Sequence, residues 1–190
     1  MHTPFNLPTP GVDSMSETKL TGATERDDVD TIIDGWVSQR PDLAPEPFAI
    51  FSRLLRLTRH VERMRKTVFA RHGLETWEFE MLAALRRTPE HTLTAGQLMK
   101  ETLVSSGTVT NRLDRMAAKG LLERKSDDRD GRVVYVKAAE KGLFLVDAAV
   151  EDLLSTEARI IEPYTLAENA EAAAYMRRLL RYFETDATAA

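Results

Sequence analysis

Apolar residues recur every three or four positions along most of the chain, which is the spacing of amphipathic helices. The longest such segments are 47–72, 139–160 and 166–184, and a shorter one at 29–37 is followed by a proline-rich link. Residues 133–136 are instead a β-branched and aromatic run, which is typical of a strand. The pattern predicts a mainly α protein with a small β-hairpin wing.

Residues 105–119 form the most informative predicted helix. Ser105 and Ser106 are typical N-cap residues, and a lysine followed by a glycine ends the segment. At 100° per residue, one side of the helix is apolar. The opposite side is small and polar at its start and basic further on, with Gly107, Thr108, Asn111, Arg112, Arg115 and Lys119. Asn and Arg form paired hydrogen bonds to base edges in the DNA major groove. Taken alone, the pattern also fits an ordinary solvated helix face.

A charged hairpin is predicted directly after this helix. The short strands flank a turn at 126–132 that carries Arg129 and Arg132, with Asp127, Asp128 and Asp130 beside them. We expect the aspartates to orient the arginines, so that one enters a narrow minor groove. The alternative is an exposed turn whose ion pairs contribute little. The helix and hairpin together favour DNA binding more than either does alone.

A second helix is predicted upstream, at 93–101. Thr94 and Gln97 have the spacing of a capping box, in which each side chain accepts a hydrogen bond from a backbone N–H of the other residue. Residues 102–104 form the turn into the next helix. The unit is therefore a winged helix-turn-helix over about residues 74–137.

These residues resemble the MarR family of winged helix-turn-helix transcriptional regulators. The resemblance is carried by SSGTVTNRLDRMAAKGLLERKSDDRDGRVVYVKAAEKG, residues 105–142, and extends loosely over 29–183. Asp128, Asp130 and Arg132 match the family's wing positions, whereas Ala138 and Ala139 replace its usual Leu-Thr. The resemblance implies a repressor that binds a palindromic operator as a homodimer. The residues expected to contact double-stranded DNA are Ser105, Ser106, Thr108, Asn111, Arg112, Arg115, Arg129 and Arg132.

The charge distribution changes the first impression given by a net charge of −4. Residues 51–72 hold seven basic and one acidic side chain, and residues 94–137 hold nine basic and six acidic ones. Basic clusters attract phosphates whatever the overall sign. The chain has no cysteine, no apolar run of about 20 residues that would span a membrane and no secretory signal pattern, so we expect a cytoplasmic protein that makes no membrane contact.

The domain organisation follows from the same patterns. Residues 1–24 are read as a disordered tail, 25–46 as an extra helix with a linker, and 47–190 as a MarR-like domain. Its dimerisation helices are expected at about 47–72 and 139–184. These helices carry more apolar residues than a small winged domain buries, which favours a homodimer.

No catalytic or metal motif is present in the sequence. The four histidines lack metal-ligand spacing, and no phosphate-binding glycine loop or nucleophile elbow occurs. The sequence therefore predicts neither an enzyme nor a cofactor or metal.

A small-molecule effector is implied by resemblance to one branch of the family, the urate-responsive HucR/PecS/MftR-like regulators. The similar segments are IIDGWVSQRPDL and GLETWEFEMLAALRRTP. The resemblance implies that Trp36 stacks on a planar ligand, that Glu80 faces it and that Arg112 couples it to DNA affinity. The branch usually has Asp at the position of Glu80, which points to a different anionic or purine-like ligand. Trp36 also fits core packing, and Glu80 also fits an ion pair with an arginine of the long helix.

Two other functions fit the sequence. One is a winged protein-interaction module that binds no DNA, which a mobility-shift assay distinguishes. The other is a DNA-binding regulator without a ligand, which a thermal-shift screen distinguishes.

Overall fold

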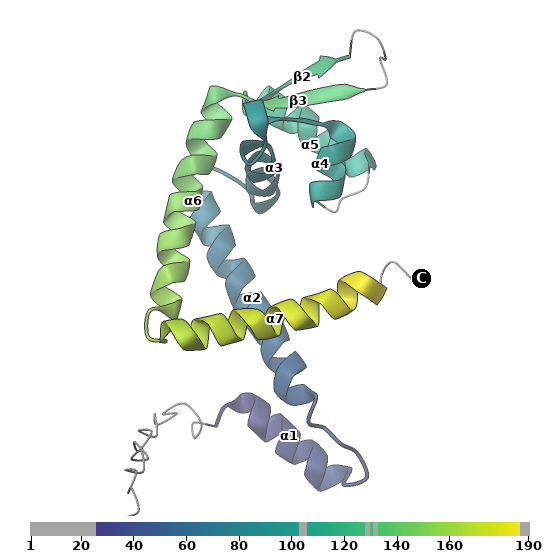
Figure 1. The fold of residues 1–190 in the computed structure, drawn as a ribbon, viewed down its shortest axis with the longest axis vertical. Coiled ribbons are helices and arrows are strands. Elements are labelled where there is room, and N and C mark those ends of the chain that lie inside the picture. Colours follow the sequence, from purple (N-terminus) through teal and green to yellow (C-terminus); the bar gives the residue numbers. More distant parts are fainter. Residues whose placement is uncertain (1–25, 103–105, 128–129, 131–132, 187–190) are drawn as a thin grey trace, which may run out of the picture. The chain divides into compact units, whose positions relative to one another are not determined.

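The helices follow the predicted amphipathic segments, and the mainly α fold class with a wing is confirmed (Figure 1). The structure is a computed structural model and describes residues 26–102, 106–127, 130 and 133–186. The α-helices in this part of the chain are α1 (Asp28–Gln39), α2 (Phe48–Arg71), α3 (Thr76–Arg86), α4 (Ala95–Thr102), α5 (Ser106–Ala118), α6 (Glu140–Ile161) and α7 (Leu166–Asp186). The remaining elements are a short 3-10 helix, η1 (Pro89–His91), and the strands β1 (Thr92–Thr94), β2 (Leu122–Ser126) and β3 (Val134–Ala138).

The strands form one antiparallel sheet in the order β1-β3-β2. The β2–β3 hairpin is the predicted wing, and it pairs Leu122 with Ala138 at its base. Strand β1 was not predicted, because three residues are too few to show an alternating pattern. The capping box that follows it is confirmed. The Gln97 backbone N–H donates to Thr94 Oγ1 at 3.2 Å, and the Thr94 N–H donates to Gln97 Oε1 at 2.8 Å.

The chain divides into two compact units, of which Met1–Leu57 is the first. Here Asp27 caps α1 by accepting a hydrogen bond from the Val29 N–H at 2.8 Å. Arg53 of α2 pairs with Asp27 and with Asp30, each at 2.8 Å. Trp36 of α1 also lies 6.2 Å, ring centroid to ring centroid, from Phe48 of α2, so charged and aromatic contacts together attach α1 to the start of α2.

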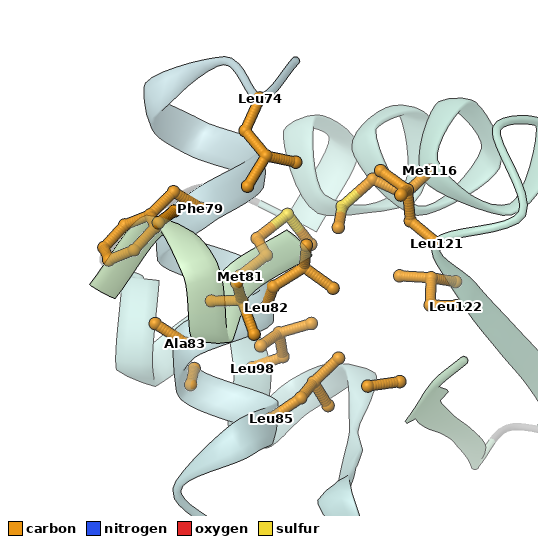
Figure 2. Packing of buried hydrophobic residues seen from close by; sticks show 14 of the residues in the cluster. Leu74, Phe79, Met81, Leu82, Ala83, Leu85, Leu98, Met116, Leu121 and Leu122 are labelled. Carbon is orange, nitrogen blue, oxygen red and sulfur yellow. The ribbon is translucent and has the colours of Figure 1, made fainter. Parts of the chain in front are cut away.

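The second unit, Thr58–Ala190, contains the main hydrophobic core. Figure 2 shows buried side chains of this core converging from α3, α4 and α5 and from the loop and strand that follow α5. Phe69 of α2 stacks on Phe79 of α3 with ring centroids 3.9 Å apart. Burying these side chains supports the unit with about 1.5–3 kcal/mol for each large one. The core thereby fixes α5 against α3.

Helix α7 is largely exposed in this chain. None of its described side chains is buried, and Met176, Leu180 and Phe183 are all more than half exposed. Among the described residues, no helix has the length and apolar character needed to span a membrane.

Candidate nucleic-acid interface

Helix α5 presents a polar and basic face because its opposite side is anchored in the core. Val109, Leu113 and Met116 are at most 3% exposed, as their periodicity predicts. On the other side, Thr108, Asn111 and Arg115 are exposed and Arg112 is half-buried. Shallow grooves run along this face, lined by Gly107, Thr108, Thr110, Asn111, Arg112, Asp114, Arg115 and Ala118. The face is therefore fixed in orientation and accessible to a large ligand such as a DNA duplex.

Hydrogen bonds continue beyond the paired strands of the wing. The Asp127 backbone N–H donates to the Val133 carbonyl at 2.9 Å, and the Asp130 N–H donates to Asp127 Oδ1 at 2.9 Å. Arg124 of β2 pairs with Asp114 of α5, which ties the wing to that helix. Among the predicted DNA contacts, Ser105, Arg129 and Arg132 lie outside the described residues, and Ser106 is the first residue of α5.

The start of α3 lies against the second half of α5. The N-cap of α3 is Glu75, with a capping box formed by Glu75 and Glu78. The Glu75 N–H donates to Glu78 Oε2 at 3.0 Å. The acid-x-x-acid spacing before an apolar run is the signal that would have identified this start.

Three groups at this start contact two arginines of α5 and the lysine that directly follows it. Arg115 Nη2 lies 3.1 Å from Glu75 Oε1, and the guanidinium carbons of Arg112 and Arg115 lie 5.2 and 4.9 Å from the ring centroid of Trp77. These are cation–π distances. Trp77 Nε1 donates to Glu75 Oε2 at 2.6 Å. The Trp77 hydrogen bond and, less strongly, the positive charge of Arg115 hold the pKa of Glu75 below its usual value.

Lys119 makes the third contact, with Glu78. Its Nζ lies 2.6 Å from Glu78 Oε1, and the Glu78 side chain is fully buried. A buried carboxylate needs such a partner, because an ionised group that is buried without one is unfavourable. Periodicity placed Lys119 on the outer face of α5, and only the fold shows that its ammonium group reaches back to α3.

The predicted ligand residues belong to both compact units, Trp36 to the first and Glu80 and Arg112 to the second. Trp36 is 43% exposed and lies 6.2 Å, centroid to centroid, from Phe48. It lines an open pocket of about 240 Å³ with Leu43, Ala44, Pro45, Pro47 and Phe48. Glu80 is exposed on α3, and Arg112 lies over Trp77. Whether Trp36 binds a ligand or only packs against its neighbours stays a prediction.

The basic segment 51–72 contributes less free positive charge than the sequence indicated. Arg53 and Arg56 pair with aspartates around the start of α1, and Arg65 and Arg71 pair with acids of α6. Across the described ranges, no group of three or more His, Asp or Glu side chains is arranged to hold a metal ion.

Comparison with known proteins places this geometry in a family. Residues 72–133 match the profile of the MarR family. The transcriptional regulator MhqR of Bacillus subtilis (strain 168) is 31% identical over 105 residues, which span 55% of this chain and 69% of MhqR. The chain belongs to the MarR family.

Two further relatives extend the comparison of this MarR-family chain. The transcriptional regulator PecS of Dickeya dadantii (strain 3937) is 29% identical over 156 residues, which cover 82% of the chain and 94% of PecS. A mutant MarR from E.coli, solved complexed with operator DNA, shares the fold with a TM-score of 0.62 and 20% identity, covering 72% of the chain and 96% of that protein. These relatives are regulators, so this member of the family is a regulator rather than an enzyme.

Proposed function

We propose that this chain is a DNA-binding transcriptional repressor that binds a palindromic operator as a homodimer and is released by a small anionic or aromatic ligand. The observation that carries DNA binding is the outer face of α5. Thr108, Asn111 and Arg115 are exposed there above a buried apolar side. This arrangement lets a helix enter a major groove without losing its own packing.

The exposed apolar residues of the C-terminal helices support a homodimer, which would contain two copies of α5. Leu154, Ile160 and Leu180 are each more than half exposed, which is unfavourable unless a second copy covers them. Two-fold symmetry would then relate two recognition helices in the way that the half-sites of a palindrome are related. DNA binding also requires access to the chromosome, which agrees with the expected cytoplasmic location.

Ligand release rests on the Trp36 pocket and on the similarity to PecS. The pocket is walled by Trp36, Phe48 and prolines, which suit a planar ring. A ligand that prefers one arrangement of the dimer shifts the population away from the DNA-binding arrangement. The lining is mostly apolar, so an anionic group on the ligand would need to be neutralised by charged residues outside it.

A direct binding experiment tests the proposed DNA recognition. The purified protein is titrated by fluorescence anisotropy with duplexes from the region flanking its gene and with shuffled duplexes of equal length, over a series of salt concentrations. We expect preference for one flanking duplex and a linear fall of log K with log salt. Equal affinity for all duplexes would contradict operator recognition, and no binding at low salt would support the protein-interaction module instead.

A thermal-shift screen of purines and aromatic acids tests the ligand. A compound that binds the folded protein raises its melting temperature, and we expect the same compound to release the preferred duplex. Trp36→Ala should abolish release while leaving DNA affinity unchanged. If release persists in Trp36→Ala, the ligand site lies elsewhere, and if no compound acts, the regulator is ligand-independent.

A further inference from the structure

The start of α3 and the outer part of α5 form one charged cluster that the sequence motifs did not reveal. Arg112 and Arg115 of α5 and Lys119, directly after it, are spaced three and four residues apart, which puts them on one side. Each contacts a group at the start of α3, namely Trp77 for both arginines, Glu75 for Arg115 and Glu78 for Lys119.

Arg115 is held in two ways and still remains accessible. Its guanidinium stacks over the Trp77 ring and donates to Glu75, yet half of its side chain is exposed. A guanidinium has five N–H donors, so a single bond to Glu75 leaves donors for another acceptor. Glu75 is itself fixed, because its other carboxylate oxygen accepts the Trp77 indole N–H. The half-buried Trp77 ring therefore orients Glu75, and Trp77 and Glu75 together orient Arg115.

We propose that Glu75 and Trp77 are positioning residues that hold Arg115 and Arg112 in the orientation in which α5 reads DNA. This rests on the proposed DNA-binding function. A free arginine loses rotamer freedom when it binds, and fixing it beforehand removes that cost from the complex. Part of the sequence preference of α5 is therefore set by side chains of α3 that make no base contact.

The direction of the change in DNA affinity when Glu75 is removed distinguishes positioning of Arg115 from competition with DNA for Arg115. If Glu75 merely competed with DNA phosphates for Arg115, removing it would strengthen binding to every duplex. If Glu75 positions Arg115, removing it weakens binding to the preferred duplex and has little effect on shuffled ones. Glu78 differs from Glu75, because it is buried and paired with Lys119, and its loss would disturb the fold.

The experiment compares Glu75→Ala and Glu75→Gln with the control Asp147→Ala. Asp147 also forms an ion pair, with Arg86 at 2.8 Å, and is about as exposed as Glu75. Both Ala variants remove one negative charge, so the control cancels the general electrostatic effect. We expect Glu75→Ala to lower affinity for the preferred duplex about two- to tenfold, as expected when one long side chain must be immobilised on binding. Glu75→Gln keeps an acceptor oxygen and should lose less.

Several outcomes would overturn the inference. Stronger binding by Glu75→Ala, a change equal to that of Asp147→Ala, or an equal loss for preferred and shuffled duplexes would each exclude a positioning role. If the unmodified protein prefers no duplex, the proposed function itself fails, which is a separate result.

Trp77 is tested by a second pair of variants. Trp77→Phe keeps an aromatic face but loses the indole N–H, whereas Trp77→Leu loses both. We expect Trp77→Leu to lose more preference for the chosen duplex than Trp77→Phe does, with unfolding curves showing that both proteins are folded at the assay temperature. Equal losses would exclude a role for the ring face, and unchanged preference in both would exclude Trp77 altogether.

Discussion

Gly142 lies where the start of α6 passes the backbone of Leu121. A Cβ atom at this position would lie 2.1 Å from the Leu121 carbonyl oxygen and 2.9 Å from a methyl group of Leu82. Neither neighbour moves freely, because the first is backbone and the second is in the core. The close approach also lets the Ala139 N–H donate to the same carbonyl at 3.1 Å. Glycine at this position thus determines how closely α6 follows the loop after α5.

Gly142→Ala should therefore lower the free energy of unfolding by about 1–3 kcal/mol, the usual cost of overpacking a core. Urea denaturation monitored by circular dichroism measures it. The matched control is Gly96→Ala in α4, where an added Cβ meets nothing within 4 Å. The control should be neutral or stabilising by up to about 1 kcal/mol, since alanine favours helix. Equal behaviour of the two variants would contradict the steric explanation.

Asn111 is the exposed amide on the outer face of α5. An asparagine in a major groove pairs with adenine and discriminates by about 1–3 kcal/mol against the wrong base. Asn111→Ala should therefore reduce the ratio of preferred to shuffled affinity about five- to a hundredfold, measured by anisotropy at fixed salt. A loss of equal size on all duplexes would instead make Asn111 a phosphate contact.

Individual residues differ in how far sequence alone could place them. Val109, Leu113 and Met116 were predicted as the buried side of α5, and they are buried, because a helical period fixes which residues share a face. Glu75 and Glu78 were missed as partners of α5, because pairs about 40 residues apart depend on tertiary packing. The DNA and ligand roles of the outer residues stay predictions.

At the scale of elements, α1 is attached to α2 by a small ionic cluster. Arg53 donates to Asp27 and Asp30, and Arg56 donates to Asp28. The hydrogen bond from Arg53 is the main reason that the pKa of Asp27 is lowered from 3.8 to about 2. A lowered carboxyl pKa stabilises the folded state above pH 3.8, and this contribution is lost as the pH falls toward 2.

Arg53→Ala should raise the pKa of Asp27 toward 3.8. Carboxyl chemical shifts followed by NMR through an acid titration measure the change. Arg56→Ala is the control, because Arg56 pairs with Asp28 and not with Asp27. If the Asp27 pKa stays near 2 without Arg53, the backbone N–H groups of Val29 and Asp30 suffice to stabilise the carboxylate.

Helix positions were predicted well because long apolar periods are a strong signal. The segment predicted at 139–160 is α6, Glu140–Ile161, and that predicted at 166–184 is α7, Leu166–Asp186. Strand β1 was missed, since Thr92–Thr94 acquires its strand character from pairing with β3, with Leu93 opposite Val136. Short edge strands depend on their partner more than on their own composition.

For the whole molecule, charge is balanced locally rather than spread evenly. The net charge of −4 coexists with basic residues on the outer face of α5, Arg112 and Arg115, and with Lys119 directly after it. The arginines of α2 named above are paired with acids of the same chain, which removes part of the basic field that residues 51–72 suggested. Composition could show where basic residues cluster, but not which of them find acids once the chain folds.

Assembly into a homodimer is the property of the whole molecule on which the proposed operator binding depends most. Leu180 of α7 is 56% exposed in the single chain, so Leu180→Asp should leave the folded protomer intact. In a homodimer that buries α7, a carboxylate at this position is unpaired and desolvated, which opposes association. We expect sedimentation to show a shift from dimer to monomer and the preferred-duplex affinity to fall at least tenfold, because one half-site is then bound alone. Arg178→Asp introduces the same side chain about 160° around α7 and should leave the dimer in place. A Leu180→Asp protein that remains dimeric and binds normally would show that α7 lies outside the interface.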